Sequence, residues 1–214
     1  MCHNPGQKMV DTQLLPRGIK DPVLLKVMAE LDRSLFVPSH SKDLAFEDTP
    51  LPIGHHQTIS QPYIVAYMTE LLNLKPDSRV LDIGTGSGYQ TAIFAGICTR
   101  GKVCSIEVIP ELSLQARKVL DSCNYTNIEF IIADAYKGYP QMAPYDGILV
   151  GCAAPQIPLP LKEQLANGGR LIIPVGGIYE TQTLILVENH DGKYVEKKME
   201  WVRFVPMVGE AQKK

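Results

Sequence analysis

The sequence of 214 residues has no long hydrophobic run and little net charge. No apolar stretch approaches the roughly 20 residues that cross a membrane, and the first residues lack the hydrophobic core of a signal peptide. The formal net charge of −2 gives no basic surface for nucleic acid and no attraction to an anionic membrane. We therefore expect a soluble cytoplasmic protein that binds neither nucleic acid nor membranes.

Paired cysteines are also missing. The five cysteines are scattered, their number is odd, and no two form a C-x-x-C pair, which is more typical of reduced thiols than of a disulfide framework. His55 and His56 are adjacent, but neighbouring side chains diverge and no third ligand follows at metal spacing. We expect no metal site.

What the chain does contain is a strand-like run that leads into three alternate glycines, Gly84, Gly86 and Gly88, before an apolar helix. Glycine permits positive φ and close approach of a ligand, and such turns in α/β sheets bind nucleotide-like molecules. The spacing is G-x-G-x-G, whereas the dinucleotide fingerprint is G-x-G-x-x-G. Glu107 ends the next predicted strand, where it can accept hydrogen bonds from both hydroxyls of a ribose. These features favour S-adenosylmethionine over a nicotinamide cofactor or a glycine turn without a ligand.

Two more acidic residues stand at predicted strand ends. Asp82 lies two residues before the first glycine, and Asp134 follows the strand predicted at 128–133. Because ligands of such sheets bind at the carboxyl ends of the strands, Asp82 can orient the turn or reach the amino group of a methionine moiety. Asp134 can accept from the exocyclic amine of adenine, with Ala135 offering a backbone N–H. One such acid is more often a helix cap or a solvated loop residue, but three at successive strand ends favour one shared site.

The remaining pattern predicts an α/β fold with a doubly wound, mainly parallel, Rossmann-like sheet, helices on both faces and an antiparallel C-terminal addition. The predicted parallel strands are 79–83, 102–107, 128–133, 146–150 and 170–174. The predicted helices between them are 89–97, 111–122 and 159–166, the last stopped by Gly168 and Gly169. Segments 183–188 and 194–199 flank Asp191-Gly192, a hairpin signal, and 201–206 is predicted as one more strand.

We expect a single domain with three parts: a helical and loop segment at 1–78, a cofactor-binding core at 79–176 and antiparallel strands at 177–214. In the first part a helix opens at Asp21-Pro22, and the turn-rich stretch 37–54 is predicted as a loop with short extended pieces. Ser60 is predicted as the N-cap of a helix with Pro62 in its first turn. Free N–H groups at such a helix start suit a carboxylate.

The run Gln57-Thr58-Ile59-Ser60, within residues 54–67, resembles the signature of protein-L-isoaspartate (D-aspartate) O-methyltransferases. Stretches 80–90, 145–155 and 165–176 match the same family, and the resemblance spans about residues 18–206. The glycine motif is shared by many methyltransferases, whereas Thr58-Ile59-Ser60 ahead of it is specific to this family. His56 departs from the small residue expected beside Gln57, which could alter the lip of the pocket.

The resemblance implies methyl transfer from S-adenosylmethionine, leaving S-adenosylhomocysteine, to the free α-carboxylate of L-isoaspartyl and some D-aspartyl residues in damaged proteins and peptides. Ser60 would be the catalytic residue that aims this carboxylate, and Gln57, Thr58 and Ile59 would help Ser60 to form the cofactor pocket. The strand with Val205 and Pro206 would line a peptide groove through backbone contacts. We expect a monomer.

Three competing hypotheses are a small-molecule methyltransferase with the same glycine turn, a nicotinamide oxidoreductase and a non-enzymatic binding module.

Overall fold

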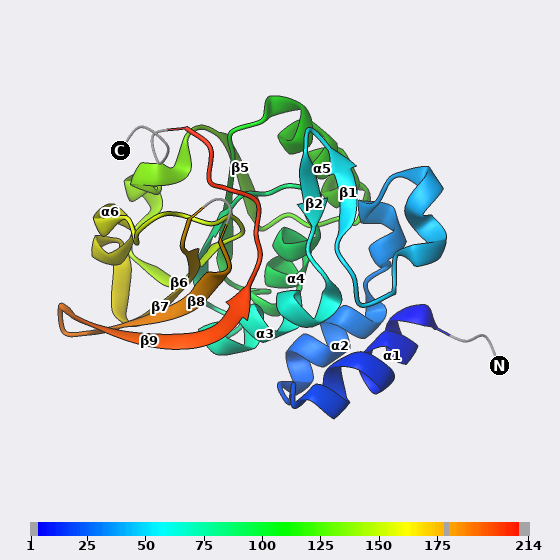
Figure 1. Ribbon diagram of the computed structural model, residues 1–214, viewed down its shortest axis with the longest axis horizontal. Coiled ribbons are helices and arrows are strands. Elements are labelled where there is room, and N and C mark those ends of the chain that lie inside the picture. The colour runs from blue at the N-terminus through cyan, green and yellow to red at the C-terminus, as the bar shows by residue number, and fades with distance from the viewer. Residues whose placement is uncertain (1–3, 178–179, 210–214) are drawn as a thin grey trace.

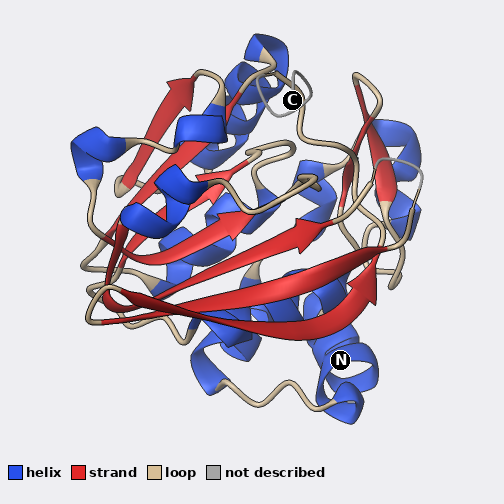
Figure 2. Ribbon diagram, turned by 60° about the vertical axis from the view of Figure 1, so that its left-hand side comes forward, coloured by secondary structure: helices blue, strands red, loops and turns tan. Residues whose placement is uncertain are grey.

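A twisted seven-stranded sheet forms the centre of the protein (Figures 1 and 2). The computed structural model describes residues 4–177 and 180–209. The strand order is β5-β4-β3-β6-β7-β8-β9. The strands are β3 (Arg79–Ile83), β4 (Lys102–Glu107), β5 (Ile128–Ile132), β6 (Tyr145–Val150), β7 (Leu165–Val175), β8 (Gln182–His190) and β9 (Lys193–Val202). Strands β3 to β7 run parallel and β8 and β9 antiparallel, which confirms the predicted sheet with its C-terminal addition.

Helices cover both faces of the sheet, as a doubly wound fold requires (Figure 2). One face carries α2 (Pro22–Glu30), α3 (Pro62–Leu72), α4 (Tyr89–Ile97) and α5 (Pro110–Ser122). The other face carries α6 (Leu159–Glu163) and two 3-10 turns, η5 (Ala135–Lys137) and η6 (Pro140–Met142). Because successive strand residues point to opposite faces, Val80 packs in the first core and Leu81 in the second.

The N-terminal segment packs on the side of the sheet that carries α3 and α4 (Figure 1). It also contains α1 (Pro5–Met9), a π-helical turn η1 (Val10–Leu14), and the 3-10 turns η2 (Leu15–Arg17), η3 (Arg33–Phe36) and η4 (Ser39–Leu44). The helix predicted at Asp21 is present, because the Asp21 carboxylate accepts the N–H groups of Val23 and Leu24 at 2.9 Å. Across residues 4–177 and 180–209, no helix has the length and apolar content needed to cross a membrane.

A small hairpin connects this segment to α3. Strands β1 (Leu51–Gly54) and β2 (Gln57–Ile59) pair in antiparallel fashion around His55 and His56, which both have positive φ, at 50° and 56°. The predicted loop at 37–54 therefore contains η4 and one strand of a hairpin. The hairpin lies over the glycine turn, since Cδ1 of Ile53 is 3.5 Å from the point where a Cβ at Gly86 would lie.

Ser60 is not the N-cap of α3, contrary to the sequence prediction. The helix begins at Pro62, Gln61 occupies the N-cap position, and the N–H of Tyr63 is accepted by Oδ1 of Asp48 at 2.9 Å. A carboxylate from the preceding loop thus replaces the local cap. The carbonyl of Ser60 accepts a hydrogen bond from Nη2 of Arg33 at 2.7 Å, which fixes this residue between β2 and the helix.

Two further predictions fail near the C-terminus. Helix α6 ends at Glu163 and β7 begins at Leu165, so Gly168 and Gly169 lie inside a strand rather than between a helix and a strand. They form a bulge, because Tyr145 pairs with Leu165 whereas Gly147 pairs with Arg170. The strand predicted at 201–206 is wrong as well, because its first two residues end β9 and only Pro206 pairs afterwards, through a parallel bridge to Ala153.

The hairpin predicted at Asp191-Gly192 is confirmed. Both residues have positive φ, at 52° and 83°, as the tight turn between two antiparallel strands requires.

Candidate active site

Three hollows meet at the carboxyl ends of the parallel strands, and Thr58 and Gly151 line all three. The outer cavity, of about 490 Å³, is lined by Arg17, Pro50, Thr58, Ser60, Gln61, Tyr63, Ile64, Gly151 and residues 200–205. The Glu107 pocket, of about 70 Å³, includes Gln57, Gly84, Gly86, Glu107, Ala133, Ala135, Cys152 and residues 205–208. The Asp82 pocket, of about 50 Å³, includes Ile59, Ser60, Asp82, Gly84, Gly86, Tyr89, Gln90 and Phe204.

The three glycines of the turn have different surroundings. All have positive φ, 90° at Gly84, 53° at Gly86 and 87° at Gly88. Gly84 and Gly86 line both small pockets, and a Cβ on either would meet only ordinary van der Waals neighbours, so the space in front of them is open. A Cβ on Gly88 would lie 3.0 Å from Cβ of Ala116 and 3.1 Å from Cδ1 of Leu120. Gly88 therefore lets α4 pack closely on α5.

Glu107 is held rigidly at the end of β4, where it is 6% exposed. Its Oε2 accepts the N–H of Gly86 at 2.9 Å, and its Oε1 accepts the N–H groups of Val108 and Ile109 at 2.8 and 2.9 Å. The carboxylate thus ties the glycine turn to its own strand end. An ionised carboxylate has about four acceptor positions, so three backbone donors leave capacity for a ligand hydroxyl.

Asp82 lies fully buried at the end of β3. Its Oδ2 accepts hydrogen bonds from the hydroxyls of Thr91, at 2.6 Å, and Ser105, at 3.1 Å. Its Oδ1 has no partner among the described residues, although the side chain lines the Asp82 pocket. Burial raises the pKa of Asp82 to about 7, and the negative charge of Glu107 adds to this rise while the two hydroxyls oppose it. An unpartnered buried acceptor beside a pocket suits an ammonium donor.

Asp134 has the structural role of a cap, which is the alternative that the sequence left open for a single acid at a strand end. Its Oδ1 accepts the N–H of Tyr136 at 2.9 Å and so caps η5. Its Oδ2 lies beside the C-terminal segment, only 2.2 Å from the point where a Cβ on Gly209 would be. Ala133 and Ala135 line the Glu107 pocket on either side of Asp134. The contact of Asp134 with adenine remains a prediction.

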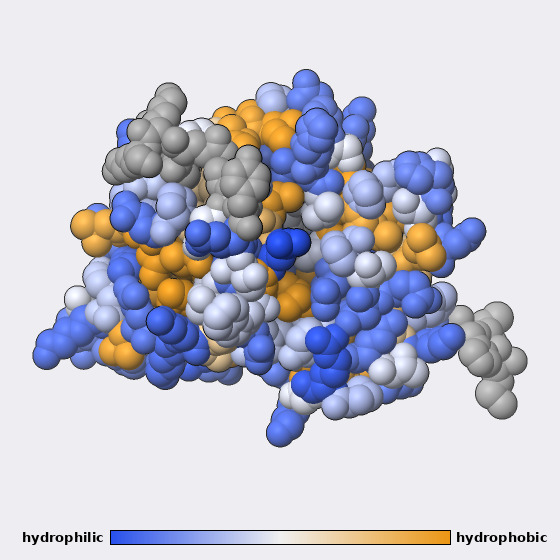
Figure 3. Space-filling model, in the orientation of Figure 1, coloured by the Kyte–Doolittle hydropathy of each residue, from blue (hydrophilic) through white to orange (hydrophobic). Residues whose placement is uncertain are grey.

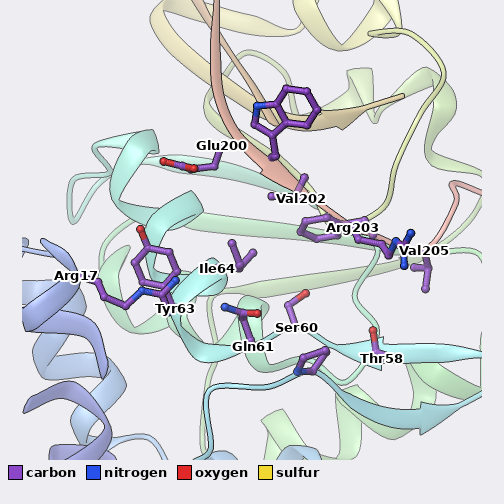
Figure 4. Close-up of a pocket in the computed structure, with 14 residues that line it drawn as sticks. Arg17, Thr58, Ser60, Gln61, Tyr63, Ile64, Glu200, Val202, Arg203 and Val205 are labelled. Atoms are coloured by element: carbon purple, nitrogen blue, oxygen red, sulfur yellow. The ribbon is translucent and has the colours of Figure 1, made fainter. Parts of the chain in front are cut away.

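The residues from the Thr58-Ile59-Ser60 run are brought to the glycine turn by the β1–β2 hairpin. Ser60 lines both the Asp82 pocket and the outer cavity, and Thr58 lies where all three hollows join. In Figure 4, Ser60 lies between Gln61 and Thr58 on one wall of the outer cavity, and Val202 and Arg203 form the other wall. Among the described residues, no hydrogen bond is found for the hydroxyl of Ser60, so it can turn toward a bound group.

The C-terminal segment after β9 closes the site on the opposite side. Val205 lines the outer cavity and the Glu107 pocket, and Pro206 lines the Glu107 pocket. The carbonyl of Val205 already accepts the N–H of Ala153 at 2.8 Å, and the N–H of Met207 donates to the carbonyl of Ala153 at 2.8 Å. This part of the chain is therefore anchored to the loop after β6.

Several residues of the outer cavity were not found from the sequence. Arg17 stacks its guanidinium 3.3 Å from the ring centroid of Tyr63 and pairs with Asp48 at 2.5 Å (Figure 4). Trp201 is 76% exposed at the cavity. No local motif marks these positions, because they come from opposite ends of the chain. On the side of the molecule drawn in Figure 3, hydrophobic residues form separate patches between hydrophilic ones.

Comparison with known proteins agrees with this geometry. A family model described as protein-L-isoaspartate(D-aspartate) O-methyltransferase matches residues 5–212. A protein-L-isoaspartate O-methyltransferase of Methanoregula boonei is 52% identical over 203 residues, which cover 95% of this chain and 92% of that protein. One from Gloeobacter violaceus is 47% identical and covers 94% of this chain and 98% of its own length.

Two solved structures share the fold over nearly the whole chain. A protein-L-isoaspartate O-methyltransferase has a TM-score of 0.88 and 27% identity, covering 96% of this chain and 67% of its own. A Plasmodium falciparum protein of the same description, solved with S-adenosyl-L-homocysteine, has a TM-score of 0.84 and 28% identity, covering 96% and 99%. This chain therefore belongs to the protein-L-isoaspartate(D-aspartate) O-methyltransferase family, which confirms the family and the class of enzyme predicted from its sequence.

Proposed function

We propose that this protein transfers a methyl group from S-adenosylmethionine to the free α-carboxylate of L-isoaspartyl, and some D-aspartyl, residues in damaged proteins and peptides. The observation that carries the proposal is the position of Thr58 and Ser60. Both lie between the pockets of the glycine turn and the outer cavity, so a donor on one side and a carboxylate on the other can meet there.

The residues around the two small pockets fit the cofactor. Gly84 and Gly86 leave open space, and Glu107 retains capacity for a ribose hydroxyl. Oδ1 of Asp82 has no partner within residues 4–177 and 180–209, so it can accept a hydrogen bond from the amino group of a methionine moiety. Ala135 lines the Glu107 pocket, and in this proposal its backbone N–H donates to adenine. When bound, S-adenosylmethionine supplies an electrophilic methyl group on a sulfonium.

The protein needs no general base for this reaction. A carboxylate with a pKa near 4 is already ionised at neutral pH. It is a weak nucleophile while it is hydrated, so the task of the chain is to remove water and to orient the carboxylate. Positioning of this kind can supply roughly 7–11 kcal/mol. In this proposal the Ser60 hydroxyl donates to the carboxylate and aims it, but does not hold it so tightly that the ground state is favoured.

The outer cavity is proposed to hold the peptide around the damaged residue. Because the Val205 carbonyl is used by Ala153, a backbone contact there would use the N–H of Val205, for which no partner is found within the described ranges. Pro206 has no N–H and would contribute only its ring and carbonyl. A groove that reads the backbone would tolerate varied flanking residues.

The proposal includes a single domain, formed by the segments 1–78, 79–176 and 177–214, that acts as a monomer in the cytoplasm. The cysteines Cys98, Cys104, Cys123 and Cys152 are free thiols, which agrees with a reducing compartment. Analytical ultracentrifugation of the purified chain would test the monomer, and fractionation of cells would test the compartment.

The deciding experiment offers labelled S-adenosylmethionine with an isoaspartyl peptide and, separately, with the same peptide containing normal aspartate. We expect label only in the isoaspartyl peptide. Equal labelling of both peptides would contradict repair specificity. If neither peptide is labelled but a small-molecule acceptor is, the protein is a small-molecule methyltransferase instead.

A further inference from the structure

We infer that Arg33 is a positioning residue for the methyl transfer, because it fixes the backbone of Ser60 and the first residue of α4 relative to each other. This inference rests on the proposed role of Ser60. Arg33 is 0% exposed and lines none of the three hollows, so it acts through the residues that it holds.

The guanidinium connects two loops that would otherwise be independent. Its Nε donates to the carbonyl of Ala45 at 2.7 Å, and its Nη2 donates to the carbonyl of Ser60 at 2.7 Å. Ala45 follows η4 and Ser60 follows β2, so a single planar group sets the distance between them. In the described part of the chain this is the hydrogen bond that holds the Ser60 carbonyl.

The same guanidinium touches the helix that follows the glycine turn. Its Cζ lies 4.5 Å from the ring centroid of Tyr89, the first residue of α4. Phe36 meets the same ring edge-on, with centroids 5.4 Å apart and planes at 64°. Residues three apart in a 3-10 helix lie on the same side of the helix, so Arg33 and Phe36 of η3 both contact the Tyr89 ring.

Arg33 therefore reaches two walls of the Asp82 pocket from behind. Ser60 and Tyr89 both line that pocket, and both are contacted by the guanidinium. A shift of the arginine would move the residue that is proposed to aim the substrate relative to the helix that follows the cofactor turn. Small misplacements of this kind strongly reduce rates that depend on orientation.

Filling space alone does not account for a charge at this position. No carboxylate lies within ion-pair distance of Arg33 among the described residues, and burial lowers the pKa of its guanidinium. Apolar side chains fill a buried space without this desolvation penalty. Two carbonyl groups, the aromatic face of Tyr89 and the more distant negative charge of Asp48 stabilise the cation. Two of these groups, the Ser60 carbonyl and the Tyr89 ring, belong to residues that line the Asp82 pocket.

The test compares Arg33→Met, which keeps bulk without charge, and Arg33→Lys, which keeps the charge without the planar fork. The matched control is Asn189→Leu, because buried Asn189 likewise donates to two carbonyls, those of Leu165 and Ala166, away from the three hollows. For each full-length variant we would measure methyl transfer to the isoaspartyl peptide, S-adenosylhomocysteine affinity by calorimetry and the urea midpoint.

We expect Arg33→Met to lower kcat/KM by about 10- to 100-fold, mostly through kcat, as loss of a charged hydrogen bond at an orienting residue predicts. Arg33→Lys should recover part of the loss. Asn189→Leu should lower the urea midpoint without changing kcat/KM. In Arg33→Ala, added guanidinium ion should restore activity better than methylammonium at equal ionic strength.

Unchanged kcat/KM in Arg33→Met would overturn the inference. So would activity losses that follow the urea midpoints equally in the arginine variants and in Asn189→Leu. If Arg33→Met does not fold, Arg33→Lys and the guanidinium rescue decide the question, since failure of both would refute positioning. A wild-type protein that labels isoaspartyl and aspartyl peptides equally would instead refute the proposed function.

Discussion

Replacing Asp82 with asparagine should remove a pH dependence of stability that the buried carboxyl group imposes on the ligand-free protein. The side chain is fully buried, and within the described part of the chain only one of its oxygens has hydrogen-bond donors, the hydroxyls of Thr91 and Ser105. Burial raises the pKa from its ordinary value of 3.8 to about 7. The folded protein therefore keeps a proton on Asp82 at pH values where the unfolded chain has lost it.

The direction in which stability changes with pH follows from this difference in bound protons. Between pH 3.8 and about 7 the folded state binds more protons than the unfolded state, so its stability falls as the pH rises. The free energy of unfolding falls by about 1.4 kcal/mol per pH unit in this interval. The total loss is about 4 kcal/mol, and it is complete above about pH 7. Asparagine cannot titrate. The free energy of unfolding of Asp82→Asn minus that of the wild type should therefore increase with pH and become constant above about pH 7.

Urea unfolding of both proteins, followed by circular dichroism at several pH values from about 5 to 8, would measure this difference. Subtracting the wild-type free energy of unfolding from that of the variant at each pH removes the contribution of other titrating groups. One of these is Glu188, whose pKa is lowered by its hydrogen bond to Lys197, so its contribution to stability is lost as the pH falls. A constant offset between the two curves would refute the reasoning, because it would mean that Asp82 is ionised in the folded protein throughout the range.

Three further substitutions test separate parts of the site. Ser60→Ala should lower kcat more than it raises KM in peptide assays, because the hydroxyl is proposed to aim the carboxylate, and a pure KM effect would mean that it only binds. Glu107→Gln should weaken S-adenosylhomocysteine binding by about 10- to 100-fold in calorimetry, because an amide has one acceptor oxygen where the carboxylate uses two for its N–H donors. Unchanged affinity would remove Glu107 from the site. Gly88→Ala should lower the urea-derived free energy of unfolding by about 1–3 kcal/mol, because the new Cβ would crowd Ala116 and Leu120 and the backbone of residue 88 has a φ of +87°. A free energy equal to that of the wild type would contradict this packing role.

The parallel core could be predicted because its signals are local. Strands β3 and β4 and helix α4 have the bounds expected from the sequence. Strands buried on both faces are continuous apolar runs, and the glycine turn separates the first of them from a helix. The rule for ligand positions in such sheets then placed Asp82 and Glu107 at one edge, where the structure has them.

Predictions failed where a distant partner decides the local structure. Gly168 and Gly169 have the composition of a helix stop, but pairing with β6 makes them a bulge within β7. Ser60 has the composition of an N-cap, but Asp48 supplies the cap and Arg33 holds the Ser60 carbonyl. Neither partner can be identified from spacing, because each depends on how loops fold against the sheet.

The β1–β2 hairpin was missed for a different reason. Its turn residues, His55 and His56, both have positive φ, a conformation that usually marks Asn-Gly or Asp-Gly pairs. A histidine pair carries no such signal, so the sequence indicated only short extended pieces. The hairpin nevertheless carries Thr58 to the junction of the three hollows. Its existence follows from tertiary contacts, such as Ile53 over Gly86, that outweigh local preference.

The position of these elements also explains where substrate selectivity must reside. The acids at the strand ends and the glycine turn belong to the parallel sheet, and they can serve any acceptor that reaches the methyl donor. Apart from Gly151 at its rim, the residues that line the outer cavity come from outside the parallel strands β3 to β7. They belong to the N-terminal turns, the β1–β2 hairpin, the start of α3 and the segment from Glu200 to Val205, which includes the end of the antiparallel strand β9. Substitutions of residues that line the outer cavity but neither small pocket, such as Arg17, Gln61 and Arg203, should therefore change which carboxylate is methylated while leaving cofactor affinity intact, whereas substitutions in the glycine turn should do the reverse.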